Sequence, residues 1–211
     1  MRVALITLTG AAVLALTGCS STPEQPPRAD STAPVIAPGR PGEQATTLSP
    51  QQAEQAVPTP TVNAADVTFM SDMILHHRQA LDMSVLAPSR AANAKVKAIA
   101  SRIKDSQAPE IQYMTSWLQE QGQKAPDHHA SHAGMPGMAT PEQMEQLKAA
   151  SGAAFDKLFL ELMIRHHQGA VEMAEKEVIN GSHRVVLELA NDVGATQSAE
   201  IGRMRRIQAE L

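Results

Sequence analysis

Apolar residues recur every three or four positions along two stretches of the chain, 66–83 and 156–173. On a helical wheel, Phe69 and Met73 of the first stretch fall on one half of the circumference, while polar residues such as Gln79 fall on the other half. The second stretch sorts in the same way, and no segment of the chain sustains the alternation of period two that a half-buried strand requires. The pattern therefore predicts helices rather than strands.

Two further stretches continue the helical period after short breaks that contain the stop signals Pro88 and Gly181. We expect these second helices at about 91–121 and 183–209. Pro109 falls inside the first of them and predicts a kink or an interruption there. Each of the two helical hairpins then has one apolar stripe to bury. The fold class that buries both is all-α, an antiparallel four-helix bundle.

The two hairpins are copies of one another. At a constant spacing of ninety residues, eight of the eighteen positions in 66–83 are identical to those in 156–173, and the spacing continues into the second helix of each hairpin. The identical residues of the first helices are Asp66/Asp156, Phe69/Phe159, Met73/Met163, Ile74/Ile164, His76/His166, His77/His167, Ala80/Ala170 and Met83/Met173. This agreement is far above chance, and it predicts a duplicated bundle with approximate two-fold symmetry.

Residues 1–19 are typical of an export signal, because a basic start precedes an apolar stretch too short to be a comfortable membrane-spanning helix. The stretch ends in Leu16-Thr17-Gly18-Cys19, which resembles the bacterial lipobox, where the cysteine becomes lipidated. We therefore expect an exported lipoprotein, anchored through Cys19 to the cell membrane or the outer membrane and facing the periplasm or the exterior. The alternative is an ordinary signal peptide with an unrelated cysteine.

Residues 20–62 hold nine of the fourteen prolines of the chain, interspersed with small and polar residues. Such a segment cannot bury enough apolar surface to offset its chain entropy, so we expect a disordered tether. The folded bundle is then expected at 63–211, with a loop rich in His and Met at 122–140 between the two hairpins.

Composition narrows the choice of function. The net charge of -4 gives no sign of the basic face that a nucleic-acid partner would need. Cys19 is the only cysteine, whereas methionine occurs 11 times. Any soft metal ligand in the folded part must therefore be methionine or histidine.

Each duplicated helix carries two adjacent histidines between methionines on its apolar face. Met73 and Met83 are about 15 Å apart along one helix, so a metal site would have to combine ligands from facing helices. The candidate ligands are Met73, His76, His77 and Met83 in the first copy and Met163, His166, His167 and Met173 in the second, with Met70 as a further candidate. Core packing is the alternative, with methionine as filler and histidine as a satisfied core residue. Burying four imidazoles costs desolvation free energy that packing alone would not offset, so the presence of two copies favours metal ligation.

Two other groups of residues could join such a site. Glu110 and Glu200 lie on the inner stripes of the second helices, where three roles stay open: a hydrogen-bonded structural carboxylate, a partner that orients a metal-bound histidine, or a direct ligand. Counting outward from the hairpin turn places Glu110 near the level of Phe69. The loop adds His128, His129, His132, Met135 and Met138. Their spacing is typical of a flexible metal-binding tract, although biased loop composition is the simpler alternative.

Combined thioether and imidazole ligands favour copper, with Cu(I) preferred and Cu(II) as a second candidate. A di-iron enzyme, the natural rival for a four-helix bundle, would need Glu-x-x-His motifs, and the chain contains none. We therefore expect copper binding without enzyme activity. The alternative function is a structural or partner-binding helical bundle without metal chemistry.

The stretches FMSDMILHHRQALDM and FLELMIRHHQGAVEM, each followed by Gln-x-x-Glu-Ile-x-x-Met, resemble the domain-of-unknown-function-305 (DUF305) family from about Asp66 to the C-terminus. The resemblance implies an exported, ferritin-like four-helix bundle whose better-studied members bind copper and support copper tolerance, through the Met and His residues of both motifs. Met70 corresponds to Leu160 in the second copy, so two sites would differ. The expected function is extracytoplasmic sequestration or chaperoning of copper, with any copper-transfer partner unknown.

Overall fold

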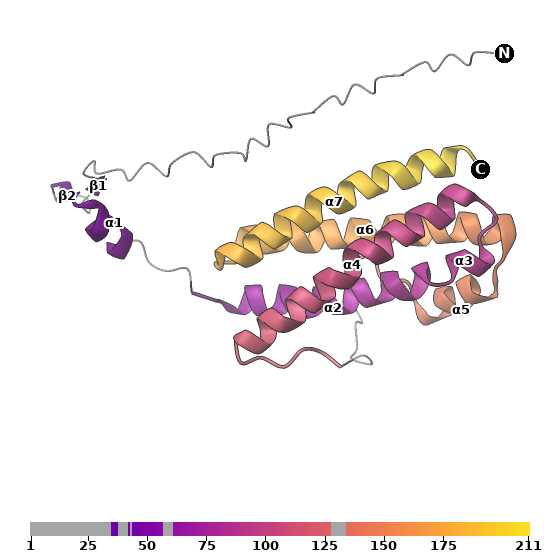
Figure 1. Ribbon diagram of the computed structural model, residues 1–211, viewed down its shortest axis with the longest axis horizontal. Coiled ribbons are helices and arrows are strands. Elements are labelled where there is room, and N and C mark those ends of the chain that lie inside the picture. The colour runs from indigo at the N-terminus through magenta and orange to yellow at the C-terminus, as the bar shows by residue number, and fades with distance from the viewer. Residues whose placement is uncertain (1–34, 38–41, 43, 57–60, 128–133) are drawn as a thin grey trace, which may run out of the picture. The chain divides into compact units, whose positions relative to one another are not determined.

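The computed structural model describes residues 35–37, 42, 44–56, 61–127 and 134–211 (Figure 1). It divides the chain into two units, residues 1–57 and 58–211, which are described separately below. Cys19 and the lipobox lie outside the described residues, so lipidation stays a prediction.

The described part of the first unit holds two short strands, β1 (Val35–Ala37) and β2 (Thr46–Leu48), which pair antiparallel, and helix α1 (Pro50–Ala56). Val, Ile and Thr in the strands favour an extended backbone, and Pro50 suits the first position of a helix. The sequence analysis expected no regular structure in 20–62, and these elements are a difference. Its role as a tether stays a prediction.

The second unit is the predicted all-α bundle. Its four long helices are α2 (Ala64–Ser84), α4 (Ala94–Glu120), α6 (Gly152–Asn180) and α7 (Arg184–Ala209), and two short helices, α3 (Ala87–Arg90) and α5 (Pro141–Ala149), lie in the connections. Helix α2 packs against α4, α6 packs against α7, and the two hairpins meet chiefly through α2 and α6 (Figure 1). The antiparallel four-helix fold and the helix assignments are therefore confirmed.

Pro109 does not interrupt α4, which runs through it. The residue lies on the exposed face of the helix, where water can satisfy the backbone carbonyl of Asp105 that the proline ring cannot serve. Of the predicted kink or interruption, the interruption does not occur, while the kink stays a prediction.

The duplicated aspartates form hydrogen bonds between the two hairpins. Asp66 of α2 accepts hydrogen bonds from the backbone N–H groups of Ser182 (3.1 Å) and His183 (3.0 Å), where α7 begins. Asp156 of α6 accepts one from the backbone N–H of Asn93 (2.9 Å), where α4 begins. Each first helix thus caps the second helix of the other hairpin, and this explains why both copies retain the aspartate.

The core consists of two clusters, one on each side of the bundle's middle. One contains Met83, Met163 and Met204, and the other contains Met70, Met73, Met114 and Met173. None of the described helices is long and apolar enough to cross a membrane.

Candidate metal centre

The two histidine pairs meet at the centre of the bundle. His76, His77, His166 and His167 are all fully buried, and the ring centroids of His76 and His166 are 3.8 Å apart with their planes tilted by 41°. Because α2 and α6 are antiparallel copies, equivalent positions come together where the helices cross. The duplication therefore brings one histidine of each copy into contact.

Methionines flank this contact on both sides. Met73 shares a buried cluster with Met173, and Met83 shares the other cluster with Met163. Each cluster thus draws at least one thioether from each copy, as the expectation of sites built from facing helices requires. Met70 is fully buried in the same cluster as Met73, so the two sides differ in thioether content.

The second histidine of each pair is bonded to a carboxylate. Nε2–H of His77 donates to Glu110 Oε2 (2.7 Å), and Nε2–H of His167 donates to Glu200 Oε2 (2.9 Å). The Glu200 side chain is 1% exposed and has Arg102 at 3.7 Å, whereas the Glu110 side chain is 28% exposed. A hydrogen-bonded carboxylate of this kind fixes the tautomer of the ring and leaves Nδ1 with the lone pair.

The level of Glu110 corrects one expectation. The count from the hairpin turn placed Glu110 near Phe69, but the carboxylate reaches His77 instead. The α2–α4 connection contains helix α3, so α4 begins beyond the end of α2 and its register against α2 is shifted.

Burial lowers the pKa of both rings of the second copy, His166 and His167. Desolvation, followed by the neighbouring rings of His76, His167 and His77, holds the pKa of His166 well below its ordinary value of 6.5. Desolvation also lowers the pKa of His167, although the hydrogen bond to Glu200 opposes the shift. A neutral imidazole with an available lone pair is the form that ligates metals.

Several buried polar atoms lack hydrogen-bond partners among the described residues. They include Nδ1 of His77 and both amide atoms of Gln107 and of Gln197. Gln107 and Gln197 are 2% exposed and precede Glu110 and Glu200 by three residues in the two copies. Both glutamines lie on the inner stripes that the helical period predicts for the second helices, and they repeat at the spacing of ninety residues. Burying a polar atom without a partner costs free energy of folding unless a water molecule or an ion binds to it.

The end of the His/Met-rich loop lies against the histidine contact. We refer to residues 134–139 as the strap. Nε2–H of His76 donates to the carbonyl oxygen of Pro136 (3.0 Å), and Gly137 takes a left-handed backbone conformation with φ +77. A Cβ on Gly169 would lie 2.0 Å from that same carbonyl oxygen, so only glycine permits this approach.

Gln79 fastens the strap from the other side. Its amide donates to the carbonyl of Ala139 (2.9 Å) and accepts from the backbone N–H of Ala139 (2.7 Å). Gln79 is 6% exposed, although it lies on the half of the α2 wheel opposite to Phe69 and Met73. The strap covers this side of α2, which the helical period alone cannot show.

The loop candidates separate into two groups. Met135 and Met138 belong to the strap and are half-buried. His128, His129 and His132 lie outside the described residues, so a collecting role for the loop stays a prediction.

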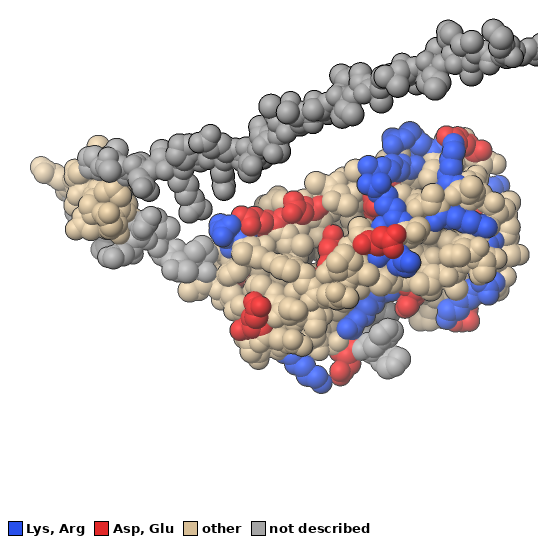
Figure 2. All heavy atoms as spheres, in the orientation of Figure 1, with Lys and Arg blue, Asp and Glu red and all other residues tan. Residues whose placement is uncertain are grey.

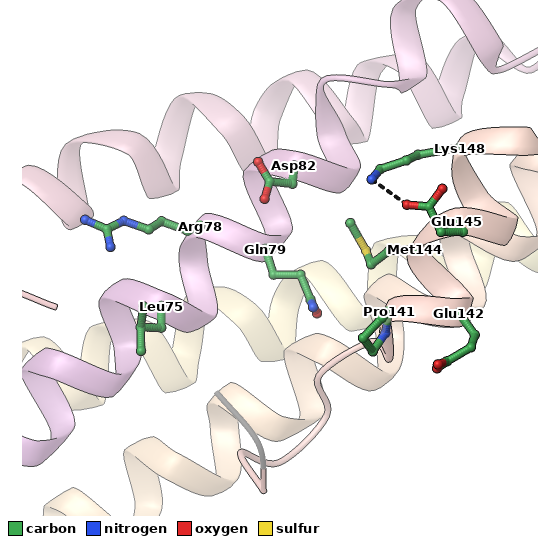
Figure 3. Close-up of a pocket in the computed structure, with 9 residues that line it drawn as sticks. All are labelled: Leu75, Arg78, Gln79, Asp82, Pro141, Glu142, Met144, Glu145 and Lys148. Atoms are coloured by element: carbon green, nitrogen blue, oxygen red, sulfur yellow. Dashed lines mark hydrogen bonds and ion pairs between the residues drawn. The ribbon is translucent and has the colours of Figure 1, made fainter. Parts of the chain in front are cut away.

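A cavity of about 610 Å³ lies elsewhere, between α2 and α5 (Figure 3). Its lining includes Leu75, Gln79, Asp82 and Met144, and it includes none of the candidate ligands. Within the part of the chain that the structure describes, no three His, Cys, Asp or Glu side chains converge closely enough to hold a metal ion. A core site would therefore depend on thioethers as well as imidazoles.

Comparison with known proteins places the chain in a family. The family model described as "Domain of unknown function (DUF305)" matches residues 66–208. A DUF305 protein of Streptomyces coelicolor, named as secreted, is 33% identical, with a TM-score of 0.64 over 69% of this chain and 93% of its own. A DUF305 fragment from Deinococcus radiodurans is 32% identical, with a TM-score of 0.67 over 72% of this chain and 100% of its own.

CopM in its Cu(II)-bound form is 32% identical, with a TM-score of 0.61 over 69% of this chain and 96% of its own. CopM is also known in Cu(I)-bound and silver-bound forms, which are 30% and 29% identical to the chain. Comparison with curated proteins gives no match. The family match covers most of the chain, and the structural likeness extends over the whole bundle. The chain belongs to the DUF305 family.

Proposed function

We propose that this protein is an exported copper-binding protein that holds Cu(I) inside its bundle with methionine and histidine ligands. The observation that carries the proposal is the contact between His76 and His166, with a methionine from each copy on either side. The facing helices supply both soft thioethers and neutral imidazoles within one buried region. This combination suits Cu(I), and silver would compete for the same donors.

The similarity to CopM supports copper as the ion, since that protein is known in Cu(I), Cu(II) and silver forms. The chain has no cysteine beyond Cys19, so methionine takes the place that a thiolate would have in a reducing compartment. Glu110 and Glu200 orient His77 and His167 rather than binding the ion themselves, because each carboxylate is already engaged with Nε2–H.

Export and anchoring belong to the same proposal. The apolar leader ending at Leu16-Thr17-Gly18-Cys19 and a secreted relative support an envelope location, with lipidated Cys19 as the anchor. The role is to sequester copper or to pass it to a partner by ligand exchange. No redox chemistry or catalysis is required for either.

A structural or partner-binding bundle is the competing function. The unpartnered Nδ1 of His77 and the amides of Gln107 and Gln197 disfavour it, because burying such groups without a partner costs about 1–3 kcal/mol each. An apolar core of the same volume would avoid that cost.

A titration of the purified protein with Cu(I) against a competing chelator tests the proposal. Replacing both central rings (H76Q and H166Q together) is expected to weaken copper binding at least tenfold, by analogy with the 10–100-fold effects of changes around metal ligands. H183Q is the matched control, since His183 is half-buried and packs against Trp117 away from the central contact. Copper affinity and stoichiometry that are the same in the double variant and the control would reject the core site.

A further inference from the structure

The proposed copper site is closed to solvent in the structure. The four central histidines, together with Met73, Met83 and Met163, have no exposed surface. Met173, which is 9% exposed, is the exception among the eight candidate ligands of the two duplicated motifs. An ion that arrives from solution needs an entry route to the buried ligands. The partial exposure of Met173 indicates that this route begins near Met173.

Met173 lines a pocket of about 380 Å³ between the first half of α2 and the last turns of α6. We refer to this pocket as the α2–α6 port. Its lining residues are Ala64, Ala65, Thr68, Phe69, Asp72, Met173, Lys176, Glu177 and Asn180. The port thus combines the thioether of Met173 with the half-buried carboxyl group of Asp72.

Thioethers continue from the port into the core. Met173 belongs to the same buried cluster as Met70, Met73 and Met114. Met173 follows His166 by seven residues, which places the two on one face of α6 about 10 Å apart along the axis. An ion held at Met173 is therefore bound by a member of this thioether cluster, two helical turns from His166.

The charges near the port favour a cation. Asp72 supplies a carboxyl group, and the one lysine of the lining, Lys176, is directed to Glu172, 2.8 Å from its carboxylate. Lys and Arg side chains gather at the opposite end of the bundle, where α4 begins and α7 ends (Figure 2). A cation is repelled from that end and attracted to this one.

The duplicated counterpart of the port is closed. In the first copy Ala87 stands where the second has Glu177, and in the second copy Leu162 stands where the first has Asp72. Both replacements are apolar and buried, and Met83, which corresponds to Met173, is fully buried. Since the duplication would otherwise produce two equal openings, the polar and open arrangement on one side is a specific feature of this chain.

The cavity between α2 and α5 is a poorer route, although it is larger. Gln79 lines it, and its amide is held by two hydrogen bonds to Ala139 of the strap, between the cavity and the central rings. Lys148 also lines this cavity, paired with Glu145 at 2.8 Å (Figure 3). None of the residues that line this cavity is a candidate ligand.

We propose that the α2–α6 port is where a cuprous ion enters the bundle, with Asp72 attracting the cation and Met173 as the first thioether to bind it. Transfer inward is ligand exchange: a lone pair of the next sulfur forms a bond to Cu(I) as the bond to the previous donor breaks, with no change in oxidation state. This inference rests on the proposed copper-binding function and adds its route.

Stopped-flow loading of the purified full-length protein with Cu(I) from a coloured chelate complex tests the port. Thr68 is exposed and lines the port, so T68W is expected to narrow the opening and slow loading at least tenfold while the final copper stoichiometry stays unchanged. D82W is the matched control, because Asp82 is also an exposed residue of α2 but lines the α2–α5 cavity. Its loading rate is expected to equal that of the unchanged protein.

A second variant keeps the test independent of the bulky side chain. D72N is expected to slow loading several-fold at low ionic strength and much less at high salt, as for electrostatic steering. Loading of T68W and D72N at the unchanged rate, with normal copper stoichiometry, would overturn the port and leave the copper site standing. A protein that takes up no copper at all would overturn the site and the port together.

Discussion

The imidazole rings of His76 and His166 lie with their centroids 3.8 Å apart, although the two residues are ninety positions apart in the chain. Both are fully buried, so two positive charges at this distance would be strongly unfavourable. The contact therefore requires at least one neutral ring in the metal-free protein. This links the stability of the bundle to pH and to copper.

The metal-free protein is expected to lose stability as the pH falls below about 6.5. The pKa of His166 lies well below 6.5 in the folded state because of burial, while the unfolded chain takes up the proton near 6.5. The unfolded state then binds more protons, so the free energy of unfolding decreases by up to about 1.4 kcal/mol per pH unit. Urea unfolding at pH 7, 6 and 5 measures this slope. H166Q should flatten it, and an identical slope in both proteins would contradict the explanation.

Replacing Glu200 with glutamine is expected to weaken Cu(I) binding about tenfold, because Glu200 orients His167 through Nε2–H at 2.9 Å. E110Q should have a smaller effect, since the Glu110 side chain is 28% exposed and water can partly replace it. Chelator competition gives both dissociation constants. E188Q serves as the control, because Glu188 pairs with Arg184 on the surface. Equal affinity of E200Q and E188Q would show that the carboxylate does not support the site.

Gly169 is expected to tolerate no side chain. A Cβ at this position would lie 2.0 Å from the carbonyl oxygen of Pro136, so G169A must displace the strap at a cost of about 1–3 kcal/mol. G194A is the matched control: its Cβ would meet only the Cβ of Ala174 at 3.8 Å, and removing a helical glycine should stabilise the protein by about 0.5–1 kcal/mol. Thermal unfolding of the two variants should shift in opposite directions. A G169A protein as stable as G194A would mean that the strap is not packed on α6.

Glu177 is expected to lower stability at neutral pH. Burial and the neighbouring carboxyl of Asp66 raise the pKa of Glu177 from 4.5 to about 7. The folded state retains a proton that the unfolded chain has lost, so this contribution to stability decreases as the pH rises from 4.5 to 7 and stays low above it. E177Q should be more stable than the unchanged protein by on the order of 1 kcal/mol at pH 8. At pH 4 the two proteins should unfold alike, and a gain that is equal at both pH values would contradict the assigned pKa.

The sequence was sufficient for the parts of the fold that follow a local period. The 3.6-residue pattern located the long helices, and the ninety-residue repeat predicted two hairpins related by approximate two-fold symmetry. These features depend on residues close in the chain or related by symmetry. Such features can therefore be predicted directly from the amino-acid sequence.

Features that depend on contacts between distant segments were not predictable. Gln79 was placed on the outer face because the period of α2 contains no information about the strap that covers it. Glu110 was placed level with Phe69 rather than with His77. The α2–α4 connection, which contains helix α3, sets the register of α4 against α2. The α2–α6 port depends on Asp72 and Glu177, which stand at unrelated positions of the repeat and meet only in the folded bundle.

X-ray absorption spectroscopy at the copper edge of the Cu(I)-loaded protein tests the central claim most directly, because it identifies the atoms bound to the ion. The account predicts sulfur and imidazole nitrogen around copper, with the sulfur signal lost when Met73, Met83, Met163 and Met173 are replaced by leucine. A spectrum with oxygen and nitrogen neighbours alone, or one that these four replacements leave unchanged, would contradict it.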